Sequence, residues 1–160
     1  MIVLGADLSY TRTGLVCLDE QYHVVDYATQ AIKPGPKRFL RALRWFTVNL
    51  RPKPDFVVIE DNAYGAPSRV VVTKLSALNT LFKVACEFED IDYVEVSPSL
   101  IKKWVTGKGT AEKHVVAQEL KRSFGIEFDD DKGYDLSDAA ALAAWGVNHY
   151  GKRSHSQIST

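Results

Sequence analysis

Five short apolar runs limit what this chain can fold into. The first three, at residues 2–6, 15–18 and 22–32, are separated only by turns, which predicts an antiparallel meander. The last two, at residues 56–60 and 93–96, alternate with helical patterns. Strands separated by helices pair in parallel through right-handed crossovers. The sequence therefore predicts an α/β fold with a mixed five-stranded sheet flanked by helices.

Helical patterns fill most of the remaining chain. One helix is expected after the Pro-Gly-Pro turn at residues 34–36, and others over residues 68–88, 98–104, 111–124 and 136–150. In the first helix, apolar residues recur at helical spacing and predict a buried stripe with the arginines on the other face: Phe39, Leu40, Leu43, Phe46, Thr47 and Leu50. At 160 residues, the chain has the size of one domain, expected at residues 1–150 and followed by a polar tail at 151–160.

Composition excludes several classes of protein. No apolar run approaches the roughly 20 residues of a membrane helix, and no signal sequence is evident, so a cytoplasmic location is expected. Cys17 and Cys86 lie far apart without a C-x-x-C motif, which argues against zinc ligation and a disulfide framework. The stretch at residues 107–110 lacks the pattern of a Walker motif, so an ATPase is not expected.

Charge is balanced overall, with 20 basic and 20 acidic residues, but it is segregated along the chain. Residues 27–54 carry seven basic residues and no acidic one, and residues 102–122 carry six basic residues against two acidic ones. A neutral chain with segregated charge can present a basic face to a polyanion, although solvated helix faces are the alternative. The residues expected to contact a polyanion in these stretches are Arg38, Arg41, Arg44, Lys102, Lys103, Lys108 and Lys113.

Four acidic residues follow apolar strands or begin an apolar helix. Asp7 and Glu60 each end a predicted strand, and Asp135 and Asp138 share one face of an alanine-rich helix. Taken singly, Asp7 is explained as a turn former, Glu60 as a strand-end charge and Asp135 as a helix cap. Gathered together, these carboxylates would repel one another unless a divalent cation bound them, and hard oxygen ligands suit Mg²⁺ or Mn²⁺. Two such ions can drive phosphodiester hydrolysis.

Four stretches together resemble RuvC-type Holliday junction resolvases, which belong to the ribonuclease H-like superfamily. They are I-V-L-G-A-D-L-S-Y-T-R-T-G at residues 2–14, V-V-I-E at 57–60, V-T-G-K-G-T-A-E-K at 105–113 and Y-D-L-S-D-A-A-A-L at 134–142. The resemblance implies a homodimeric endonuclease that cuts four-way or other branched DNA. It also implies that Asp7, Glu60, Asp135 and Asp138 bind two metal ions, and that Lys102 and Lys113 lie near the scissile phosphate.

The chain departs from the family pattern at two turns. Ala63 stands where the family often has an aromatic residue, and Tyr64 follows it, so Tyr64 is either a wedge at the junction centre or a packing residue. Leu8-Ser9-Tyr10 replaces the usual Pro-Gly after the first strand. The short chain and divergent loops favour a phage-type member, which would act in the host cytoplasm. The alternatives are another ribonuclease H-like nuclease, acting on RNA–DNA hybrids or flaps, and a non-catalytic DNA-binding module.

Overall fold

Five strands form one mixed sheet in the order β3-β2-β1-β4-β5, as the apolar runs predict. The structure is a computed structural model that describes residues 1–9, 11–61 and 69–151, with the backbone alone described for residues 69–75. The strands are β1 (Val3–Asp7), β2 (Thr13–Leu18), β3 (Val24–Gln30), β4 (Phe56–Glu60) and β5 (Tyr93–Val96). The first three pair antiparallel, whereas β4 pairs parallel with both β1 and β5.

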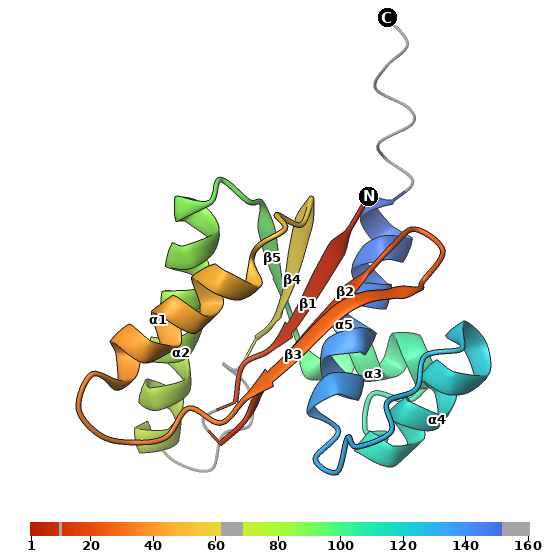
Figure 1. The fold of residues 1–160 in the computed structure, drawn as a ribbon. Helices are drawn as coiled ribbons and strands as arrows, with labels where there is room; N and C mark the ends of the chain where they lie inside the picture. Colours follow the sequence, from red (N-terminus) through yellow and green to blue (C-terminus); the bar gives the residue numbers. More distant parts are fainter. Residues whose placement is uncertain (10, 62–68, 152–160) are drawn as a thin grey trace, which may run out of the picture.

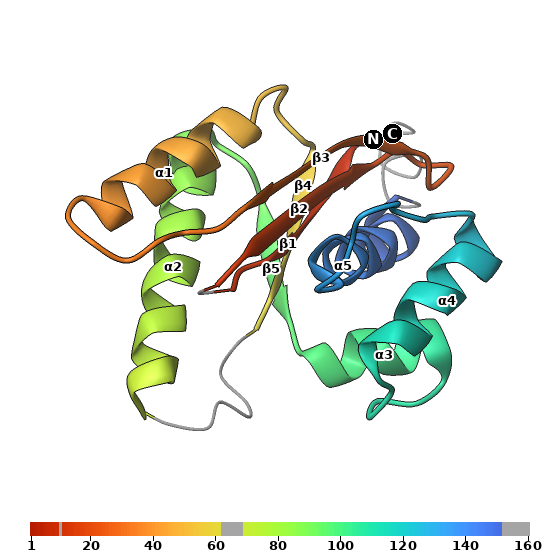
Figure 2. The ribbon, with the colours of Figure 1, turned by 60° about the horizontal axis from the view of Figure 1, so that its bottom comes forward.

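Helices cover both faces of this sheet (Figures 1 and 2). One face carries α1 (Arg38–Asn49) and α2 (Arg69–Phe88), and the other carries α3 (Pro98–Thr106), α4 (Lys113–Phe124) and α5 (Asp135–Tyr150). Successive strand side chains point to opposite faces, so each strand contributes to two separate cores. Val3 and Val58 pack on the α5 side, whereas Leu4 and Val57 pack on the side of α1 and α2.

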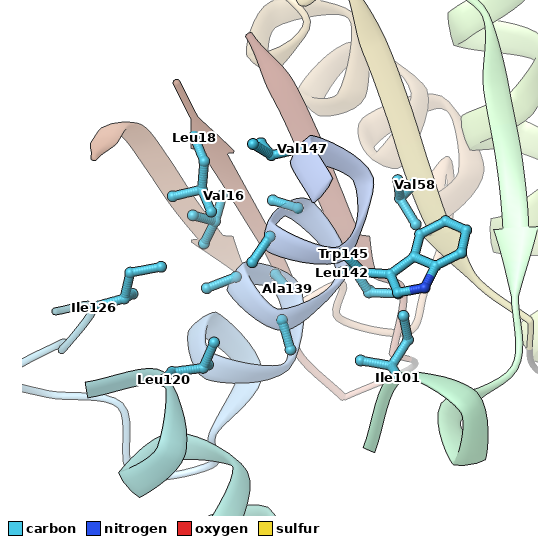
Figure 3. Packing of buried hydrophobic residues seen from close by; sticks show 14 of the residues in the cluster. Val16, Leu18, Val58, Ile101, Leu120, Ile126, Ala139, Leu142, Trp145 and Val147 are labelled. Atoms are coloured by element: carbon cyan, nitrogen blue, oxygen red, sulfur yellow. The ribbon is translucent and has the colours of Figure 1, made fainter. Parts of the chain in front are cut away.

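The helix α5 is the centre of the core on its side of the sheet. Its residues from Leu136 to Val147 are buried, except for Asp138. Figure 3 shows Ala139, Leu142 and Val147 on this helix, with strand residues on one side and the Ile101 and Leu120 side chains of α3 and α4 on the other. A helix that is apolar all round belongs in the interior, and α5 therefore has a fixed position against the strands.

The structure corrects the predicted orientation of α1. Its buried residues are Arg38, Ala42 and Phe46, and Leu50 directly after it is buried too. Phe46 and Leu50 thus confirm part of the predicted stripe, whereas Phe39 and Leu40 are 47% and 43% exposed. These buried positions are four residues apart and form one stripe, so the helix is rotated by about one residue from the predicted orientation. The prediction that Arg38 lies on an exposed face available to DNA is wrong, because its side chain is packed into the protein.

Several smaller expectations can also be compared with the structure. The third strand is shorter than residues 22–32, because Tyr22 takes a left-handed turn conformation before β3 begins. Both cysteines are free thiols; Cys86 is buried and Cys17 is half-buried. None of the helices in the described part of the chain has the length and apolarity needed to cross a membrane. Residues 152–160 of the predicted tail lie outside the described residues.

Candidate active site

Asp7 and Glu60 lie side by side at the carboxyl ends of two neighbouring strands. The register pairs Ala6 with Ile59 in the parallel β1–β4 ladder, so the next residues on each strand are Asp7 and Glu60. Asp7 shares its strand face with Val3 and Gly5, and Glu60 shares its face with Val58, which is the face covered by α5. Both carboxyl groups therefore project toward α5, and a hydrogen bond joins them.

Two glycines allow α5 to approach the strands at this end of the sheet. A Cβ placed on Gly5 would lie 2.0 Å from the backbone oxygen of Ala139, and one on Gly14 would lie 2.2 Å from that of Asp135. Real Cβ atoms do not approach backbone oxygens this closely, so no larger residue fits either position without moving the helix. The first turn of α5 consequently lies directly over the end of β1.

The first turn of α5 supplies the other two carboxylates. Asp135 and Asp138 are three residues apart and share a helix face. The alternative explanation of Asp135 as a helix cap is wrong, because the side chain of Asp131 accepts the hydrogen bonds at the helix N-terminus. The backbone N–H groups of Leu136 and Ser137 donate to Asp131 at 3.1 and 2.8 Å, and the Ser137 hydroxyl donates to it at 2.7 Å. Asp135 is therefore not used as the cap and lines the cleft at this end of the sheet.

Burial and mutual repulsion disfavour ionisation of all four carboxyl groups. Burial raises the pKa of Asp7 well above its ordinary value, and the charges of Glu60 and Asp138 raise it further. Burial also raises the pKa values of Glu60, Asp135 and Asp138, while the charge of Lys113 opposes the shift at each. Burial is the largest cause of the raised pKa at both Asp7 and Glu60, so the pair is disfavoured from carrying two negative charges at once.

Two lysines stand beside these carboxylates, Lys102 and Lys113, which the family resemblance implies lie near the scissile phosphate. Lys113 is the first residue of α4, and its Nζ lies 2.5 Å from Asp138 Oδ2. Burial lowers the pKa of Lys113, but the hydrogen bond and charge of Asp138 outweigh this effect and raise it overall. A cation at a helix N-terminus opposes the helix dipole, so the adjacent carboxylate explains why lysine is tolerated here. Lys102 on α3 lines a small cavity with Glu60, Lys113 and Asp138.

A cleft of about 460 Å³ opens over this cluster. It is lined by Asp7, Glu60, Asp135, Lys113 and Gly133, and by residues of the turn between β1 and β2: Leu8, Ser9, Thr11 and Arg12. Arg12 Nε lies 3.5 Å from Asp135 Oδ2. Site residues that sequence reasoning missed are thus Arg12 and Asp131. Arg12 gives no periodic signal, and Asp131 is one of three consecutive aspartates with nothing to single it out.

The candidate metal ligands have the chemistry that a hard divalent cation prefers. Every candidate ligand is a carboxylate, and positive charge nearby would lower the raised pKa values and relieve the repulsion. In the described part of the chain, no group of three or more Asp, Glu, His or Cys side chains is arranged so that it could hold a metal ion without rearrangement. Instead, each carboxylate has a neighbour: Asp7 bonds Glu60, Asp138 pairs with Lys113, and Asp135 pairs with Arg12. A cation would have to replace some of these contacts.

The remaining predicted DNA contacts lie away from the cleft. Lys103 and Lys108 are exposed on α3 and the loop after it, but they do not line the cleft. Arg41 and Arg44 are exposed on α1, which covers the opposite face of the sheet, and the Arg41 guanidinium donates to the backbone oxygens of Lys33 and Pro36. Tyr64, the candidate wedge, lies outside the described residues.

Solved structures share this fold. Thermus thermophilus RuvC superposes with a TM-score of 0.77 at 22% sequence identity, covering 96% of this chain and 97% of that one. The same protein in complex with a Holliday junction substrate gives a TM-score of 0.79 at 19% identity, covering 98% and 96%. The fowlpox virus resolvase with Holliday junction DNA gives 0.57 at 14% identity, covering 92% and 97%. At these identities, the likeness concerns the fold.

Sequence comparison extends the likeness to family level. The RuvC of Chloroherpeton thalassium is 30% identical over 155 residues, which cover 91% of this chain and 81% of that protein. The RuvC of Orientia tsutsugamushi strain Ikeda is 30% identical over 157 residues, which cover 93% and 97%. The family model described as crossover junction endodeoxyribonuclease RuvC matches residues 3–146. Because this match spans nearly the whole chain, the chain belongs to the RuvC family of crossover junction endodeoxyribonucleases.

Proposed function

We propose that this protein is a metal-dependent endonuclease that resolves four-way DNA junctions by paired phosphodiester hydrolysis. The observation that carries the proposal is the convergence of Asp7 and Glu60 with the first turn of α5, flanked by Lys102 and Lys113, in a chain of the RuvC family. The Thermus relative and the fowlpox virus resolvase have each been solved with Holliday junction DNA. The site of action would be the compartment that holds this DNA, the cytoplasm.

Asp7, Glu60, Asp135 and Asp138 would hold the metal, as two Mg²⁺ or Mn²⁺ ions. When bound, such ions supply an activated water and stabilise the charge on the leaving oxygen. The lysine side chains of the protein contribute by balancing charge. Lys113 and Lys102 offset the negative charge of the cluster at Asp138 and Glu60, which lets a phosphate approach four carboxylates. On entry of the phosphate, the Lys113 ammonium can donate to a phosphate oxygen while staying beside Asp138.

Exposed cations outside the cleft would hold the DNA arms. Arg44, Lys103 and Lys108 are exposed, and Arg41 is exposed with its guanidinium bonded to backbone oxygens. Contacts of this kind supply affinity without sequence readout. Arg38 is left out of this set because it is buried.

Substrate geometry requires two active sites. Resolving a junction needs two opposed cuts, and a two-fold dimer presents two identical sites in opposed orientation. The chain mass is 17.9 kDa, so sedimentation at micromolar protein is expected to give about twice this mass. A strict monomer, with and without junction DNA, would contradict the paired-cut proposal.

A cleavage panel tests the function directly. Labelled four-way junction, flap, linear duplex and RNA–DNA hybrid are incubated with the protein in Mg²⁺ or Mn²⁺. We expect paired cuts in the junction and little cutting of the linear duplex. Preferred cutting of hybrid or flap would identify a different nuclease of the same fold, and binding without cutting of any substrate would identify a non-catalytic DNA-binding module.

A further inference from the structure

Three residues of the turn between β1 and β2, Ser9, Thr11 and Arg12, add polar side chains to the cleft besides its carboxylates and lysine. The Ser9 and Thr11 hydroxyls lie 3.0 Å apart, and the backbone N–H of Thr11 donates to Ser9 Oγ at 3.3 Å. The Thr13 hydroxyl donates to the backbone oxygen of Ser9 at 3.2 Å, which ties the turn to the start of β2. The side chains of Ser9, Thr11 and Arg12 line the cleft together with Asp7 and Asp135.

Arg12 is held in place from two sides while part of it stays accessible. Its Nη2 donates to Thr29 Oγ1 on β3 at 3.1 Å, and its Nε lies 3.5 Å from Asp135 Oδ2. A guanidinium carries five N–H donors in a fixed plane, so these two contacts engage only part of its capacity. The side chain is 45% exposed. The guanidinium is therefore oriented in advance and still able to bind an acceptor from solvent.

Arg12 offsets part of the negative charge of the cleft. Besides Arg12, the one other cation among the described residues lining the cleft is Lys113, which Asp138 pairs directly. A nucleic acid strand that enters must pass the carboxylates of Asp7, Glu60 and Asp135, and it does so more readily where a cation can neutralise a phosphate. Arginine suits this task because its planar donors match two phosphate oxygens.

We infer that Ser9, Thr11 and Arg12, in the turn between β1 and β2, bind a DNA phosphate next to the one that is cut. Arg12 is the charged contact, and the further donor is whichever of the Ser9 and Thr11 hydroxyls does not donate to the other. The inference rests on the proposed function, since it assumes that a DNA strand lies in this cleft. It assigns a role to residues of the turn in which Leu8-Ser9-Tyr10 replaces the usual Pro-Gly of the family.

Substitution of Arg12 tests the inference through DNA binding, without relying on cleavage. Junction affinity is measured by fluorescence anisotropy in Ca²⁺ over a series of salt concentrations for wild type, Arg12→Gln and Arg12→Lys. We expect Arg12→Gln to bind roughly tenfold more weakly at low salt, the size of one lost charge-assisted contact. The slope of log K against log salt should become shallower by about 0.9, the value for one phosphate. Arg12→Lys should keep the wild-type slope, because its charge remains.

A matched control separates this effect from a general loss of positive charge. Arg51 is also an exposed arginine paired with a carboxylate, Glu89 at 2.9 Å, but it precedes β4 at the end of the sheet away from the cleft. Arg51→Gln should therefore bind junction DNA with the wild-type affinity and salt slope. An equal loss in both variants would overturn the inference, because it would reflect net charge alone.

Thermal stabilisation by Mn²⁺ provides the second readout, because Arg12 also contacts Asp135. If Arg12 binds phosphate, Arg12→Gln should be stabilised by Mn²⁺ at least as well as wild type. Loss of that stabilisation with an unchanged salt slope would mean that Arg12 acts by positioning Asp135, and the inference would be wrong. Unchanged affinity and slope would overturn it as well. Failure of the proposed function gives a different result, in which wild type cuts no junction.

Discussion

The ammonium of Lys113 lies 2.5 Å from the Asp138 carboxylate and thereby joins the first residue of α4 to the first turn of α5. The Lys113 side chain remains 48% exposed, whereas that of Asp138 is 17% exposed. One lysine thus offsets charge in the carboxylate cluster and keeps part of its surface toward the cleft. We therefore expect Lys113 to couple the cluster to an incoming phosphate.

Replacing Lys113 by methionine should therefore impair cleavage more than folding. We expect the cleavage rate to fall by roughly a hundredfold, the size of one lost charge-stabilising donor. Lys113→Arg should recover part of it. Lys83 is a suitable control, because it pairs with Glu95 at 3.1 Å away from the cleft, and Lys83→Met should cut at the normal rate. Single-turnover cleavage of labelled junction measures each variant, and a normal rate for Lys113→Met would exclude it from the chemistry.

Asp7→Asn keeps the shape of the side chain and removes the charge that a metal needs. Cleavage should fall by on the order of a thousandfold, while junction binding, measured by gel shift in Ca²⁺, should be retained. The control is Asp92→Asn, an exposed aspartate before β5, which should cut normally. If Asp7→Asn cuts as fast as wild type, the carboxylate cluster is not the active site.

The same substitution predicts a pH-dependent gain in stability in the presence of EDTA. Because the pKa of Asp7 is raised in the folded protein, the folded state holds more protons than the unfolded state above the ordinary value of 3.8. Stability then falls as pH rises from that value through the folded pKa. Asn does not titrate, so Asp7→Asn should gain stability relative to wild type as pH rises. For each tenfold by which folding raises the proton affinity of Asp7, this gain in the free energy of unfolding can reach about 1.4 kcal/mol.

Urea unfolding of both proteins between pH 4 and pH 8 measures this difference. The free energy of unfolding of wild type is subtracted from that of Asp7→Asn at each pH. Carboxylates whose pKa values are lowered, such as Asp19 and Glu119, contribute equally to both proteins, so their contribution cancels. A difference that stays constant across this range, or that shrinks as pH rises, would show that the pKa of Asp7 is not raised in the folded protein.

Gly5→Ala should displace α5 from the sheet. The added Cβ would lie 2.0 Å from the backbone oxygen of Ala139 and 2.6 Å from the backbone nitrogen of Ala143, and backbone atoms cannot move aside as a flexible side chain can. Overpacking of this kind costs about 1–3 kcal/mol. Because α5 carries Asp135 and Asp138, cleavage should fall along with the melting temperature. An unchanged melting temperature would mean that α5 is less closely packed than the structure indicates.

Asp131→Ala should weaken the start of α5 and, with it, metal binding. Loss of a helix cap costs about 1 kcal/mol, and the Mn²⁺ concentration that gives half-maximal thermal stabilisation should rise several-fold. Asp130 is the matched control, since it is the adjacent aspartate and it pairs with Lys132 at 3.6 Å. Asp130→Ala should match wild type in both measurements. Equal behaviour of the two variants would show that the cap does not position Asp135 and Asp138.

The sequence alone predicts the fold class and the four carboxylates. Apolar runs and turns predict the five strands, and their spacing predicts which pairs are antiparallel. Asp7 and Glu60 each follow a run of buried strand residues, where an acidic side chain is expensive to bury without a partner. Lys113 and Lys102 follow from the family resemblance, and the structure places both beside the carboxylates.

The tertiary structure decides how each element faces its neighbours. The α1 stripe contains both arginine and apolar residues, and periodicity alone does not reveal that Arg38 is buried while Phe39 is exposed. Arg12 and Asp131 act through partners far along the chain or across a turn, namely Thr29, Asp135 and the backbone of Ser137. Local propensity governs which residues form strands and helices. The rotation of a helix and the contacts of a turn depend on the atoms packed against them, and the packed sheet brings those atoms together.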